Sequence, residues 1–146
     1  MHLRARSSST VLRLYPEDFD LNGLVHHPRY LLLVERALVD LWEELGYPAG
    51  DEDLRQYLRV ILADYHSPVT WRRELTVDLW TVRVGRTSVT YGFAIHSGDP
   101  EQPHVSGKRV AVKVNPATGR PAPWGDRMRE DLLSLTRFPI GNNDDQ

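Results

Sequence analysis

The residues best equipped for chemistry lie in one short stretch, Tyr15 to Tyr30, which reads YPEDFDLNGLVHHPRY. It holds three acids and two histidines within eleven residues, between an apolar run and a helical pattern. A carboxylate such as that of Asp20 can act as a nucleophile or a general base, and an imidazole such as that of His27 can transfer a proton. The competing interpretation is structural, because Asp20, Asn22 and Gly23 are also typical of an Asx-type turn.

Other kinds of catalytic site are not expected. Neighbouring histidines such as His26 and His27 seldom aim at one ion, and no HxxxH spacing occurs, so we expect no metal. The chain has no cysteine, which excludes disulfides, thiolate ligands and a cysteine nucleophile. A serine hydrolase is disfavoured because no serine lies in a GxSxG context, as shown by Ser67, Ser88 and Ser106.

Size and composition predict an ordinary globular domain. The chain has 146 residues, 40% hydrophobic and 26% charged, and we expect one domain over 1–146 with a core at about 10–136 and flexible ends at 1–8 and 139–146. No apolar run reaches the roughly 20 residues that span a membrane. The net charge of −2 gives no reason to bind nucleic acid. The start, MHLRARSSSTVLRL, lacks the apolar segment of a secretory signal, so we expect a cytoplasmic protein.

One long helix is expected directly after the polar stretch. Apolar residues recur there at spacings of three and four, which is the period of an amphipathic helix: Leu31, Val34, Leu38, Leu41 and Leu45, with Ala37 and Trp42 beside them. Pro28 suits the first turn, and Gly46 suits the position after the last. The helix should therefore run from about 27 to 46.

The remaining elements are strands and one short helix. The first strand is expected at 11–15, and four more at 57–66, 74–84, 87–96 and 104–114. The short connections between the last three strands favour antiparallel hairpins, and we expect the last four strands to form a meander. A short helix is expected at 125–136. The sequence thus predicts an α+β fold, with a five-stranded antiparallel sheet curled around the long helix.

The strand at 87–96 alternates most clearly. Val89, Tyr91, Phe93 and Ile95 share one face, which we expect to be apolar and buried. The other face carries Ser88, Thr90, Gly92 and Ala94, and is small enough for a bulky group to lie across it.

The run VLRLYPEDFDLNGLVHHPRYLLLVERA resembles the opening signature of the 4-hydroxybenzoyl-CoA thioesterase-like family. That signature reads approximately aromatic-x-[DE]-[DE]-x-D-x-x-G-x-V-x-[HNY]-x-x-Y, with a Glu and an Ala on the following helix. The matching positions are Tyr15, Asp18, Asp20, Gly23, Val25, His27, Tyr30, Glu35 and Ala37. The later blocks ADYHSPV, GRTSVTYGF and VAVKVNPATGRP are also similar to the family, so the resemblance covers nearly the whole chain.

The resemblance implies a hot-dog fold and an acyl-CoA thioesterase without a cofactor, since coenzyme A is part of the substrate. The family's catalytic carboxylate corresponds to Asp20, and the expected catalytic set is Asp20, Gly23 and His27. The expected substrate-binding residues are Val25, Tyr30, Arg86 and Ser88, with Arg86 at a position where relatives place a basic residue for nucleotide phosphate. A homo-oligomer, either a dimer or a tetramer, is also implied.

The chemistry of a thioester agrees with this resemblance. A free Asp has a pKa of about 3.9, so its carboxylate is charged at neutral pH and can attack without a separate base. The oxyanion that forms needs a fixed donor, and the first N–H groups of a helix lack helical partners. Pro28 has no N–H, so the backbone N–H of His27 is the expected donor.

Two other functions stay open at this point. A hot-dog enoyl-CoA hydratase uses an Asp and a His in a DxNxxH loop. Asp20 and Asn22 fit that pattern, whereas Val25 stands at the histidine position. A non-catalytic module that binds an acyl thioester is the third hypothesis, because a fold alone does not establish chemistry.

Overall fold

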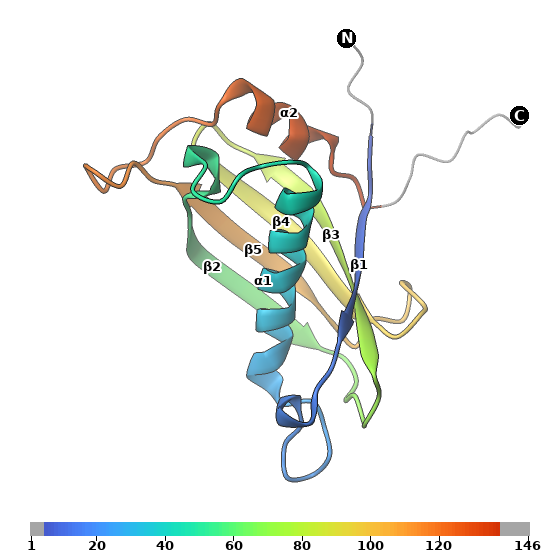
Figure 1. Cartoon of the computed structure of the whole chain (residues 1–146). Coiled ribbons are helices and arrows are strands. Elements are labelled where there is room, and N and C mark those ends of the chain that lie inside the picture. The colour runs from blue at the N-terminus through green and yellow to red at the C-terminus, as the bar shows by residue number, and fades with distance from the viewer. Residues whose placement is uncertain (1–4, 138–146) are drawn as a thin grey trace, which may run out of the picture.

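The computed structural model describes residues 5–137, which form a five-stranded antiparallel sheet and two α-helices. The strands are β1 (Ser8–Arg13), β2 (Gln56–Tyr65), β3 (Glu74–Val84), β4 (Ser88–His96) and β5 (Val105–Lys113). The helices are α1 (His27–Glu44) and α2 (Asp126–Ser134). Figure 1 shows α1 lying across one face of the curved sheet, with α2 near one end of it. The predicted α+β architecture is confirmed.

The strands follow the order β1-β3-β4-β5-β2. As predicted, β3, β4 and β5 are consecutive antiparallel neighbours. The expected four-strand meander is wrong for β2, which pairs with β5 at the far edge and is not adjacent to β3. The connection 66–73 is longer than the loop of about two to five residues that joins a tight hairpin, so β3 is free to start on the other side of the sheet.

The helix α1 packs on the sheet over a wider arc than its sequence pattern predicts. Leu31 and Leu45, which belong to the predicted stripe, are only half-buried. Tyr30 and Leu33, which lie outside that stripe, are 3% and 1% exposed. A sheet that wraps around a helix covers more than one narrow stripe of it. The buried side chains of α1 are Tyr30, Leu33, Val34, Ala37, Leu38, Leu41 and Trp42.

Both ends of α1 lie where the sequence predicts them. Pro28 sits in the first turn. Gly46 follows the last turn with a φ of +83°, a backbone conformation that favours glycine. The N–H of Gly46 donates to the carbonyl of Glu43, and that of Tyr47 donates to the carbonyl of Trp42. These bonds satisfy carbonyls that have no partner within the helix.

The face of β4 turned away from α1 is covered by a side chain from the neighbouring strand. Gly92 is paired with Trp80 of β3, and a Cβ at position 92 would lie 2.2 Å from the Trp80 ring. The expected bulky group across this small face is therefore a tryptophan of the same chain. It requires glycine at position 92.

The first described residues are held in place. β1 begins at Ser8, three residues earlier than expected. The N–H of Arg6 donates to the carbonyl of Ser134, and the carbonyl of Arg6 accepts from the N–H of Thr136, both at 2.8 Å. Within the expected flexible start, Arg6 is hydrogen-bonded and Ser8 lies in β1, while residues 1–4 and 139–146 lie outside the described part. No helix within residues 5–137 is long and apolar enough to cross a membrane.

Candidate functional site

The polar stretch folds into a small hairpin ahead of α1. Phe19 and Val25 form an antiparallel bridge, and the N–H of Asp20 donates to the carbonyl of Leu24 at 2.7 Å. The N–H of Gly23 closes the turn by donating to the carbonyl of Asp20 at 3.0 Å. Gly23 has a φ of +75°, which explains why glycine is needed there. The turn fixes the position of residue 20.

The two oxygens of the Asp20 carboxylate differ in their surroundings. Oδ1 accepts from the N–H of Asn22 at 2.8 Å and from the N–H of Leu24 at 3.1 Å, as in an Asx turn. Oδ2 has no hydrogen-bond partner among residues 5–137. The structural and catalytic interpretations of Asp20 are therefore compatible, because one oxygen holds the turn while the other is free to react.

Asp18 has a structural role in the same loop. It is 2% exposed, and its Oδ2 accepts from the N–H of Tyr15 at 2.7 Å. Its Oδ1 lies 3.8 Å from Nη1 of Arg29, and its carbonyl accepts from the N–H of His26 at 2.8 Å. Asp18 thus ties the loop to the start of α1.

The first turn of α1 offers one backbone donor near Asp20. The N–H of His27 is at the first helical position, where it has no partner within the helix. Pro28 has no N–H, and the N–H of Arg29 donates to the carbonyl of His26 at 2.8 Å. The N–H of His27 makes no hydrogen bond to any residue of the range 5–137. It lies at the positive end of the helix dipole, where negative charge is stabilised.

Asp20 and His27 line two hollows in common. The first, of about 360 Å³, is also bounded by Val25, Tyr30 and Tyr65. The second, of about 630 Å³, lies over the loop and includes His26 among its lining residues. The structure therefore brings together the predicted residues Asp20, His27, Val25 and Tyr30, while Gly23 contributes through the turn.

Tyr65, at the end of β2, is a site residue that sequence reasoning missed. Its hydroxyl donates to the carbonyl of His27 at 3.2 Å, and its ring centroid lies 5.8 Å from that of Tyr30. Tyr65 belongs to the block ADYHSPV, which resembles the family, but its separation from His27 along the chain gives no local signal.

Tyr30 lines the smaller hollow together with Tyr65 and Asp20. Burial is the main cause that raises the pKa of the Tyr30 hydroxyl, and the nearby Tyr65 and Asp20 raise it further. A hydrogen bond with the backbone of Val69 acts in the opposite direction. The hydroxyl therefore stays protonated at neutral pH.

A second group of polar side chains adjoins the hollow beyond Tyr65. Ser67, which lines the hollow, lies 2.8 Å from Nδ1 of His104, whose Nε2 lies 2.8 Å from Ser97. Burial first, then the charges of Arg72 and His96, lower the pKa of His104. Within residues 5–137 no three His, Asp or Glu side chains are grouped as metal ligands.

Arg86 and Ser88 lie at the other end of the sheet. Tyr65 pairs with Val105, and Val105 pairs with Ile95, so the Asp20 end coincides with the last residues of β4. Ser88 begins β4, seven residues from Ile95, which corresponds to about 23 Å at 3.3 Å per residue. Within one chain, the structure therefore does not bring Arg86 and Ser88 to the Asp20 hollow (Figure 1).

Residues 22–104 match the sequence model of the thioesterase superfamily, which is more than half of the 146-residue chain. The match includes Gly23, Val25, His27 and Tyr30 and begins after Asp20, so it does not bear on the catalytic role of that carboxylate. No curated protein matches the chain in sequence.

Several solved structures share the fold. A predicted thioesterase from Bacillus stearothermophilus is 22% identical with a TM-score of 0.80, over 91% of this chain and 99% of that one. A thioesterase from Thermus thermophilus in complex with coenzyme A and zinc is 23% identical, with a TM-score of 0.74 over 86% and 91% of the two chains.

A 1,4-dihydroxy-2-naphthoyl-CoA thioesterase from Synechocystis is 14% identical, with a TM-score of 0.78 over 88% and 96% of the two chains. At these identities the structures show the fold alone, which is the expected hot-dog fold. The family follows from the sequence match: the chain belongs to the thioesterase superfamily and is a thioester hydrolase.

Proposed function

We propose that the chain hydrolyses acyl-CoA thioesters, with Asp20 as nucleophile or general base and the His27 N–H as the donor to the thioester carbonyl. The observation that supports this most is the shared position of the two groups. Asp20 and His27 line the same two hollows, and each has one reactive atom without a partner among residues 5–137.

The reaction would run between these two groups. The carbonyl oxygen accepts a hydrogen bond from the His27 N–H, which stabilises the negative charge that develops on it; removing such a donor from other enzymes costs about 2.7–4 kcal/mol of barrier. Asp20 Oδ2 then attacks the carbonyl carbon, or removes a proton from a water that attacks. The C–S bond breaks, and the thiolate of coenzyme A leaves and takes up a proton.

The two proposed roles of Asp20 differ in whether its carboxylate forms a covalent bond to the acyl group. As a nucleophile, Asp20 forms a mixed anhydride with the acyl group, and water then hydrolyses the anhydride and restores the carboxylate. As a general base, Asp20 never forms a bond to the acyl group. A single turnover in water labelled with oxygen-18 can detect the anhydride, because water that attacks its Asp20 carbonyl leaves label in that side chain, which mass spectrometry reads and which the general-base route never gives.

The neighbouring side chains would hold the substrate. Val25 and Tyr30 bound the smaller hollow, where the thioester end of the acyl group would lie. Arg86 remains the proposed contact for a nucleotide phosphate. Because Arg86 and Asp20 lie at opposite ends of one sheet, that contact is most simply made to the substrate of a second copy of the chain.

The edge of the sheet supports such an assembly. β2 is an edge strand of the described sheet, and it exposes large apolar side chains: Tyr57, Leu58, Val60, Leu62 and Tyr65 are each 42–64% exposed. An unpaired apolar edge is a template for pairing with another strand. We therefore propose a homo-oligomer, a dimer or a tetramer, joined through β2.

A panel of acyl-CoAs with short, long and aromatic acyl groups tests the proposed activity. Release of free thiol from at least one member is the expected result, and release from none would refute the proposal. Crotonyl-CoA tests the hydratase hypothesis in the same panel. Loss of absorbance by its double bond without release of thiol would indicate a hydratase. Tight binding of coenzyme A without any turnover would indicate a non-catalytic module.

A further inference from the structure

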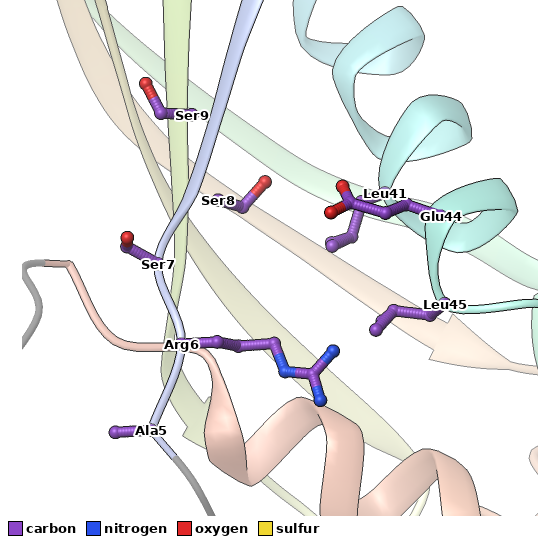
Figure 2. Close-up of a pocket in the computed structure, with 8 residues that line it drawn as sticks. All are labelled: Ala5, Arg6, Ser7, Ser8, Ser9, Leu41, Glu44 and Leu45. Carbon is purple, nitrogen blue, oxygen red and sulfur yellow. The ribbon is translucent and has the colours of Figure 1, made fainter.

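A polar hollow of about 350 Å³ lies at the other end of α1 from Asp20. It is situated between the start of β1 and the last turn of α1, as Figure 2 shows. Its volume lies within the range of about 300–1,000 Å³ that is typical of small-molecule sites. None of its lining residues belongs to the hollows around Asp20.

Opposite charges face each other across this hollow. The guanidinium of Arg6 extends from the segment just before β1, and the carboxylate of Glu44 extends from α1 (Figure 2). Neither side chain has an ion-pair or hydrogen-bond partner among residues 5–137. The last turn of α1 contains no basic residue, but Arg127 of α2 donates to the carbonyl of Leu45, so the negative charge on this side of the hollow is that of the Glu44 carboxylate. The α1 side of the hollow thus attracts a cation, and the β1 side attracts an anion.

The hydroxyl of one largely buried residue also faces the hollow. Ser8 is 8% exposed, and its Oγ is directed toward α1 in Figure 2. This Oγ makes no hydrogen bond to a residue of the described part. Because the Ser8 Oγ is not among the buried atoms without a partner in the described residues, it is accessible from the hollow, where it can donate to or accept from a bound polar group. The wall next to this hydroxyl is apolar, because it is formed by the side chains of Leu41 and Leu45.

We infer that this hollow binds a small zwitterion with an aliphatic group, such as a free α-amino acid with a branched side chain. A planar guanidinium binds a carboxylate with two parallel hydrogen bonds, which suits Arg6. Glu44 accepts from the ammonium group, and Leu41 and Leu45 contact the aliphatic side chain. Glu44 repels phosphate groups and Arg6 repels metal ions, so neither anion nor cation alone satisfies both sides.

Titration of the nitrogen-15-labelled chain with L-leucine tests the inference by NMR. Saturable shifts are expected at the backbone amides of Ser8, Glu44 and Leu45. Two half-ligands serve as controls: 4-methylpentanoate lacks the ammonium group and 3-methylbutylamine lacks the carboxylate, and each is expected to bind at least about tenfold more weakly, given the strength of a charge-assisted hydrogen bond.

Variants of Arg6 and Glu44 test whether leucine binds between these two charged side chains. Arg6→Gln and Glu44→Gln are each expected to raise the Kd for leucine about tenfold or more. Glu43→Gln is the matched control, since Glu43 is the neighbouring acid and lines a different hollow, and its Kd should equal that of the unchanged chain.

Three results would overturn the inference. The first is the absence of saturable shifts at these amides up to the solubility limit of leucine. The second is an equal affinity for the half-ligands, for inorganic phosphate or for a divalent cation alone. The third is an equal Kd for the Arg6 and Glu44 variants and the Glu43 control. Since binding is read without turnover, these results leave the proposed thioesterase activity untouched.

Discussion

Two aspartates at opposite ends of the sheet have different surroundings. Asp20 and Asp53 are both half-buried, and each accepts a backbone N–H on Oδ1. At Asp53 that donor is the distant Gly125, at 2.9 Å, and the same oxygen also accepts from Nζ of Lys113 at 2.8 Å. Asp20 has no cation partner within residues 5–137 and adjoins two hollows. A carboxylate that is paired holds the fold, whereas one that is unpaired beside a hollow is free to react.

Breaking the ion pair between Asp53 and Lys113 should have the largest effect on stability. Lys113→Met leaves the Asp53 carboxylate without its cation, in a pair whose side chains are 11% and 16% exposed. The free energy of unfolding should fall by about 3–5 kcal/mol, as for other buried pairs that lose one partner. Urea unfolding measures it, and Lys108→Met, at an exposed lysine, is the control. If Lys113→Met and Lys108→Met lowered the free energy of unfolding equally, the structural role of the Asp53–Lys113 pair would be contradicted.

Within the catalytic end, Asp18 should behave unlike its near neighbour Asp20. Asp18→Ala leaves the N–H of Tyr15 without its acceptor and removes the partner of Arg29. Unfolding measurements should show a loss of about 1–3 kcal/mol, the cost of an unsatisfied buried donor. The folded variant should retain thioesterase turnover. If turnover disappeared while stability stayed unchanged, Asp18 would be a catalytic residue.

A smaller effect is expected at Tyr65. Tyr65→Phe removes the hydrogen bond to the carbonyl of His27 and keeps the ring against Tyr30. The lost bond is worth about 0.5–1.5 kcal/mol, so kcat/KM for thiol release should fall by about tenfold or less. Tyr47→Phe, which removes a tyrosine hydroxyl bond to Asp131 away from the Asp20 hollow, should have no such effect. Equal losses in both variants would remove Tyr65 from the site.

The smallest effect concerns pH. The pKa of His104 is lowered in the folded chain from its ordinary value of 6.5, so the unfolded chain binds more protons near that pH. The stability due to neutral His104 is therefore present above about pH 6.5 and is lost as the pH falls below it. Urea unfolding across this range should show a weaker pH dependence in His104→Asn than in the unchanged chain. Identical pH profiles would contradict this expectation.

The features that the sequence predicts correctly are those whose causes are local. Pro28 and Gly46 limit α1 through backbone geometry at their own positions, and Gly23 sets the turn beside Asp20 in the same way. These conformations depend on residues only a few positions apart, so a pattern in the sequence contains them.

The features that the sequence does not predict depend on distant partners. The place of β2 beside β5, the bond between Tyr65 and His27 and the ion pair of Asp53 with Lys113 each join residues dozens of positions apart. Arg86 illustrates the same point. It matches a position where the family places a basic residue, but that match does not indicate how far Arg86 lies from Asp20. Strand order, which no local pattern encodes, decides which side chains meet.

The most direct test of the account is the kcat/KM for thiol release by Asp20→Asn, measured together with its free energy of unfolding. The new side chain keeps an oxygen that can accept from Asn22 and Leu24, and it replaces the reactive, charged second oxygen with a neutral amide NH2 group. We predict a fall in kcat/KM of about 10²–10⁴-fold, the usual contribution of a general base, with stability within about 1 kcal/mol of the unchanged chain. Turnover close to that of the unchanged chain, in a folded variant, would contradict the assignment of Asp20 as the catalytic carboxylate.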